Sequence, residues 1–151
     1  MSADPCADVT PNLLSERHFE QNGERIDLSI DAEHRAVVVL VGKGSVPGAK
    51  LLIEMVDEME AELPPGLLVT ALVDVRKVQG VPLRAQGMLL RRGLRSLHQA
   101  SRVAIVGAGA FELGVARALA AMAGMSRKVH FGRSVADAIR YLGWPAERYL
   151  D

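Results

Sequence analysis

The chain has 151 residues, which is the usual length of one domain. Hydrophobic residues make up 49% of it and charged residues 24%, a composition that excludes a disordered chain. The 18 basic and 18 acidic side chains cancel, so no overall charge favours nucleic acid or an anionic membrane, and we expect neither as a partner.

No apolar run reaches the roughly 18 residues of a membrane-spanning helix, and the N-terminus lacks a secretory pattern. The single Cys6 cannot form an internal disulfide. We therefore expect a soluble, cytoplasmic protein with one core.

The N-terminal segment and the first predicted strands differ in their patterning. Residues 1–18 show no periodicity and contain two prolines, which predicts a flexible arm before a single domain over 19–151. Ile26, Leu28 and Ile30 alternate with polar residues, as in a strand with one exposed face. The β-branched run 36–41 predicts a strand covered on both faces, so the two strands form a hairpin.

From residue 46 onward, helical and strand patterns alternate. Helices are predicted over 46–63, 82–99, 111–125 and from Ser134 to Leu142, and strands over 67–75, 102–106 and 128–131. In the second helix we expect Leu83, Leu90, Leu94 and Leu97 to face inward. The order ββαβαβαβα predicts one mixed, mostly parallel five-stranded sheet with about four helices, because alternating strands and helices imply parallel pairing.

A glycine-rich turn follows the strand over 102–106. Gly107 and Gly109 resemble the start of a dinucleotide-binding turn, in which glycines let the backbone approach a phosphate at a helix N-terminus. Glu112 stands where the third glycine of that pattern belongs, so we favour a tight turn of small residues and keep nucleotide or anion binding as an alternative. Asp74 ends another predicted buried strand, where the ligands of α/β sheets bind.

The predicted helix over 111–125 is apolar nearly all round, because only Glu112 and Arg117 are charged. Such a helix needs cover on more than one side. We expect a partner interface, most simply in a homodimer, and the alternative is a small apolar or acyl ligand beneath the helix. The interface residues would be Phe111, Gly114, Ala118, Ala121 and Met122.

A cationic stripe runs along the helix predicted over 82–99. Arg84, Arg91, Arg95 and His98 follow one another at spacings of seven, four and three residues, so they share one side of the helix. The stripe indicates either a site for an acidic partner or a solvated face that pairs with the acidic side of the 46–63 helix. We include its three arginines in the predicted partner interface.

The remaining polar residues predict no catalysis. No histidine has a second histidine or cysteine at metal-ligand spacing, and no serine lies in a nucleophile-elbow context. We expect no metal, no cofactor and no enzymatic activity.

Several of these segments together resemble a known family. LLVTALVDVRKVQG, RVAIVG and KVHFGRSVADAIRYLGW, in this order over residues 19–144, are similar to the SpoIIAA-like group of bacterial STAS and CRAL-TRIO-type domains. The resemblance implies a mixed sheet with helices packed on it and a role in protein interaction or regulation. Anti-sigma-factor antagonists of this group carry a phosphorylated Asp-Ser-Ser-Gly motif after the Asp-bearing strand. Residues 75–82 of this chain contain no hydroxyl group.

Overall fold

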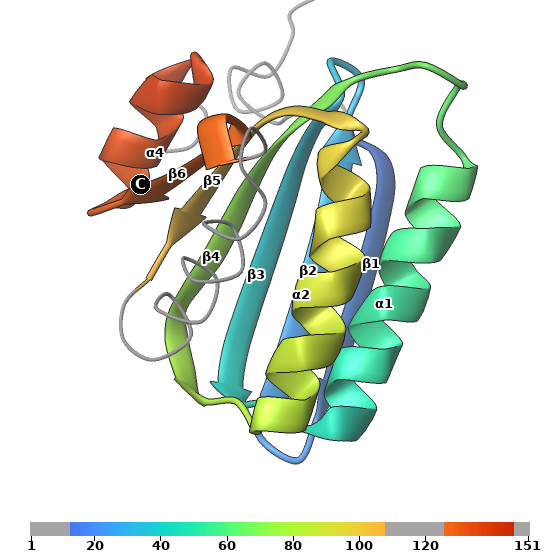
Figure 1. Ribbon diagram of the computed structural model, residues 1–151, viewed down its shortest axis with the longest axis vertical. Helices are drawn as coiled ribbons and strands as arrows, with labels where there is room; N and C mark the ends of the chain where they lie inside the picture. Colours follow the sequence, from blue (N-terminus) through green and yellow to red (C-terminus); the bar gives the residue numbers. More distant parts are fainter. Residues whose placement is uncertain (1–12, 108–125, 147–151) are drawn as a thin grey trace, which may run out of the picture.

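A single mixed sheet organises the molecule, which is described from a computed structural model over residues 13–107 and 126–146 (Figure 1). The strands neighbour one another in chain order. The first three are antiparallel, and β3 to β6 are parallel. The strands are β1 (Leu13–Gln21), β2 (Glu24–Asp31), β3 (Arg35–Lys43), β4 (Val69–Gly80), β5 (Ala100–Val106) and β6 (Val129–Gly132). The predicted mixed, mostly parallel α/β fold is therefore confirmed.

The described helices begin and end at residues suited to those positions. Helix α1 (Val46–Ala61) begins after Ser45, whose Oγ accepts a hydrogen bond from the Gly48 amide at 3.0 Å. Helix α2 (Leu83–Leu97) follows Pro82, and a short 3-10 turn, η1 (Ser126–Lys128), precedes β6. Helix α4 (Val135–Leu142) is capped by Ser134 as predicted, and it ends at Gly143 in a left-handed conformation.

The described helices cover both faces of the sheet. Helices α1 and α2 lie side by side on one face, against Leu28 and Val38 among others (Figure 1). Helix α4 packs on the other face, where Val37 and Leu72 meet Ile139 and Trp144. Neighbouring strand residues thus face different helices, because side chains alternate across a strand.

The structure corrects three details of the sequence analysis. The sheet has six strands rather than five, since residues 13–18, expected in the N-terminal arm, begin β1. Strand β4 continues to Gly80, five residues past its predicted end. Leu83 was expected to face inward, but at the start of α2 it is 84% exposed. Three α-helices are described, and the predicted helix over 111–125 lies outside the described residues.

None of the helices in the described part of the chain combines the length and the apolar character that crossing a bilayer requires.

Candidate functional site

Asp74 lies inside β4 rather than at its end, because the strand continues to Gly80. Its Oδ1 accepts hydrogen bonds from the backbone amide and the Nε of Arg76, at 3.1 and 2.9 Å, and its Oδ2 accepts one from Nη2 at 2.8 Å. Burial disfavours the charged carboxylate, but the hydrogen bonds from Arg76 outweigh it, so the pKa of Asp74 is below its usual value. The carboxylate is therefore engaged by a neighbour two residues away on its own strand.

Gly107 directly follows β5, whose last residue pairs with Asp74. The structure thus brings these two predicted site residues to adjacent strands. A Cβ at Gly107 would lie 2.3 Å from Cγ2 of Val75, and the backbone φ is +156°. Close approach of two strands therefore explains this glycine without a ligand. Gly109 lies outside the described residues.

The predicted partner interface is described only in its cationic part. Phe111, Gly114, Ala118, Ala121 and Met122 lie outside the described residues. Arg84, Arg91 and Arg95 are exposed on α2, and none of the described residues forms an ion pair with them.

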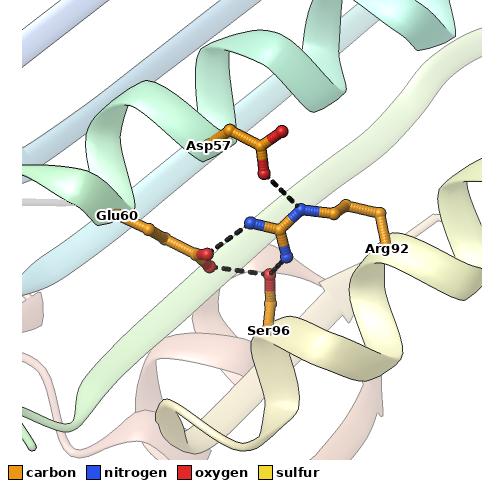
Figure 2. A network of polar contacts seen from close by, with 4 residues as sticks. All are labelled: Asp57, Glu60, Arg92 and Ser96. Carbon is orange, nitrogen blue, oxygen red and sulfur yellow. Dashed lines mark hydrogen bonds and ion pairs between the residues drawn. The ribbon is translucent and has the colours of Figure 1, made fainter.

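Arg92, next to the stripe, connects α2 to the acidic side of α1 (Figure 2). Its Nε donates to Oδ1 of Asp57 at 2.7 Å, its Nη1 donates to Oγ of Ser96 at 2.9 Å, and its Nη2 donates to Glu60. Ser96 in turn donates to Oε1 of Glu60 at 2.8 Å. Burial disfavours the charged guanidinium, whose side chain is 9% exposed, but the two carboxylates outweigh it and raise the pKa of Arg92.

The acidic side of α1 also has a partner on β1. Arg17 bonds to Glu58 at 3.2 Å and to Glu62 at 2.5 Å. The sequence analysis considered pairing between the cationic stripe and this acidic side. The structure makes that contact through Arg92, which leaves the stripe itself exposed.

An apolar cavity of about 250 Å³ lies between the sheet and helices α1 and α2. The described strands β2 to β6 all contribute aliphatic side chains to its wall, as do both helices. Glu60, Arg92 and Ser96 are the polar side chains among the described lining residues, so the network of Figure 2 borders the cavity. Sequence analysis predicted an apolar site beneath the 111–125 helix, but it did not predict this cavity.

A second polar cluster joins β6 to α4. Nε2 of His130 lies 2.8 Å from Oδ2 of Asp137, and the ring of His130 stacks on Tyr141 with 4.6 Å between centroids. The contact with His130 holds the pKa of Asp137 below its usual value. Spacing along one helix or strand does not predict this pair, because the two residues meet across a strand-to-helix turn. Among the described residues, no group of three histidine, cysteine or acidic side chains could hold a metal ion.

Comparison with solved structures identifies the fold. No family model matches the chain, and no curated protein matches it significantly. A crystal structure of an uncharacterised Shewanella loihica PV-4 protein, described as having a SpoIIAA-like fold, is 18% identical; the match covers 94% of this chain and 98% of that one, with a TM-score of 0.56. This chain has a SpoIIAA-like fold. An anti-sigma factor antagonist from Mycobacterium paratuberculosis is 14% identical over 85% of this chain and 93% of its own, with a TM-score of 0.49. The match to the Shewanella protein confirms the SpoIIAA-like fold expected from the resemblance.

Proposed function

We propose that this protein is a cytoplasmic, non-enzymatic interaction module that binds an acidic segment of a protein partner or of a second copy of itself. The contact residues on α2 are Arg84, Arg91 and Arg95. The proposal rests on one observation, which is that all three arginines are exposed on one side of α2. Arg92, which lies beside them, already forms ion pairs with Asp57 and Glu60 of α1.

Arginine suits this role because its planar guanidinium matches a carboxylate with two parallel hydrogen bonds. The acids of α1 do not occupy these three arginines, since Asp57 and Glu60 bind Arg92 while Glu58 and Glu62 bind Arg17. A partner carboxylate therefore meets no competing acid from those four residues. Phe111, Gly114, Ala118, Ala121 and Met122 remain a predicted apolar part of the same interface.

Charge reversal of the stripe tests this function. In low salt, the wild-type protein is expected to sediment as a dimer at tens of micromolar or to bind a labelled poly-glutamate peptide. The triple variant Arg84→Glu, Arg91→Glu, Arg95→Glu loses that association. The matched control, Arg127→Glu, Arg133→Glu, Arg140→Glu, reverses three exposed arginines of η1, the β6–α4 connection and α4, and it keeps the association. A monomer that binds the peptide no better than the triple variant contradicts the proposal.

A second candidate function is the binding of a small apolar ligand, and the cavity of about 250 Å³ favours it. Ligand pockets are lined mainly by hydrophobic side chains with few polar groups, as this one is. Native mass spectrometry of detergent-free protein from its own host tests this candidate. A bound apolar molecule that leaves only on unfolding supports it, whereas a mass equal to the bare chain counts against it.

A further inference from the structure

We propose that the cavity between the sheet and helices α1 and α2 selects an uncharged medium-chain apolar molecule and excludes the anionic form of a fatty acid. The inference rests on the second candidate function above and deepens it. It follows from the size of the cavity, from the hydrogen bonding of its polar residues and from the charges beside it.

The size of the cavity sets the size of the ligand. An engineered apolar cavity of about 150 Å³ holds benzene, and pockets for drug-sized molecules begin at about 300 Å³. The volume of about 250 Å³ therefore fits a molecule between these two limits, such as a medium-chain alcohol.

The polar side chains at the cavity already bind one another. Nε, Nη1 and Nη2 of Arg92 each donate to a protein oxygen, which uses three of the five N–H groups of the guanidinium, and Ser96 both accepts from Arg92 and donates to Glu60. A ligand carboxylate at Arg92 would therefore have to share the guanidinium with the mostly buried carboxylate of Glu60. Two like charges at one guanidinium repel each other, which disfavours an anionic ligand.

The charges of the network also oppose an anion. Asp57 and Glu60 carry two negative charges against the one positive charge of Arg92. A ligand carboxylate in the cavity would lose its water and lie close to the carboxylate of Glu60, which lines the wall, and both effects disfavour it. An uncharged molecule suffers neither effect, because the remaining described wall is apolar.

Octan-1-ol and octanoate form a matched pair of probes, since they share a chain length and differ in the charge of the head group. Titration of the full chain at pH 7.5, followed by calorimetry and by backbone amide shifts, is expected to show binding of octan-1-ol at least tenfold tighter than binding of octanoate. The Kd of the alcohol should fall by about fourfold for each methylene added until the cavity is full.

Variants on the two faces of β3 locate the site. Val38 lines the cavity, whereas its neighbour Val37 packs on the α4 side of the sheet. Val38→Phe is expected to weaken octan-1-ol binding at least tenfold, while Val37→Phe leaves it within twofold. Ala71→Leu, which also fills the cavity, supplies an independent test if Val38→Phe does not fold.

Removing one charge tests the selectivity itself. Glu60→Gln is expected to reduce the preference for octan-1-ol over octanoate at least threefold, and Glu58→Gln, on the exposed side of α1, leaves that ratio unchanged. Equal binding of the two wild-type probes overturns this inference but leaves the second candidate function standing. If neither probe binds to the wild-type chain, both this inference and the second candidate function are overturned. The same holds if the Val38→Phe and Ala71→Leu variants bind octan-1-ol as tightly as the wild type does.

Discussion

Gly107 is a residue whose sequence context and structural environment indicate different roles. In the sequence it belongs to a turn that resembles a phosphate-binding loop. In the structure it allows β5 to end against Val75 of β4, where no side chain fits. Sequence reasoning could therefore predict that a glycine is needed here, but the neighbouring strand that requires it is visible only in the fold.

Gly107 and Gly80 have similar backbone conformations but different surroundings. Substituting each by alanine therefore distinguishes backbone strain from steric overlap. Gly107 and Gly80 have φ values of +156° and +150°, but nothing lies within 4 Å of a Cβ at Gly80. Gly107→Ala is expected to lower the free energy of unfolding by about 2 kcal/mol more than Gly80→Ala, because only the former forces two side chains to overlap. Urea denaturation measures both. Equal losses would show that β4 and β5 accommodate the methyl group.

Asp74 contributes stability that depends on pH. Its pKa is lower in the folded chain than the ordinary value of 3.8, so the folded state favours the ionised form. The contribution is complete above pH 3.8 and is lost as the pH falls through the folded pKa. Asp74→Asn should therefore weaken the acid dependence of the urea midpoint below pH 3.8. A variant that loses stability as steeply as the wild type would assign that acid dependence to other carboxyl groups.

At the scale of elements, alternation and helical periodicity predicted the segments that bury an apolar face. The edge strand β1 escaped prediction because most of its side chains are exposed or half-buried, with Phe19 its main contact to the core. The end of β4 was missed for a similar reason. Its last residues are mainly polar and are held by backbone pairing, as between Lys77 and Val41 of β3.

Arg92 makes the ion pairs between α1 and α2, and its neighbour Arg91 provides the control. Arg92→Ala is expected to lower the free energy of unfolding by about 2 kcal/mol, less than for a fully buried pair because Asp57 remains half-exposed. Arg91→Ala should change it by no more than about 0.5 kcal/mol, since Arg91 is exposed. Urea titrations at pH 7 measure the free energy of unfolding of both variants. Similar losses for the two variants would mean that the ion pairs do not stabilise the helix contact.

At the scale of the whole molecule, the sequence predicted features that lie on one element better than features assembled from several elements. The stripe of Arg84, Arg91 and Arg95 follows from spacing on a single helix. The cavity could not be predicted in this way, because its wall combines residues far apart in the chain, such as Leu28, Leu52 and Val103. Its polar border has the same origin, since Arg92 and Glu60 are 32 residues apart.

Deleting the edge strand β1, which the sequence did not predict, tests whether the rest of the sheet is stable without it. Removal of residues 1–22 deletes the whole strand, exposes the backbone groups of β2 and removes the contact of Phe19 with the core. We expect a clearly lower urea midpoint and concentration-dependent aggregation. Arg17→Ala is the control for the ion pairs of the strand. It is expected to leave the urea midpoint nearly unchanged, because Arg17 bonds to the exposed Glu58 and Glu62 and surface ion pairs contribute little. A truncated chain that unfolds at the same urea concentration as the full chain would show that the sheet from β2 to β6 is stable without β1.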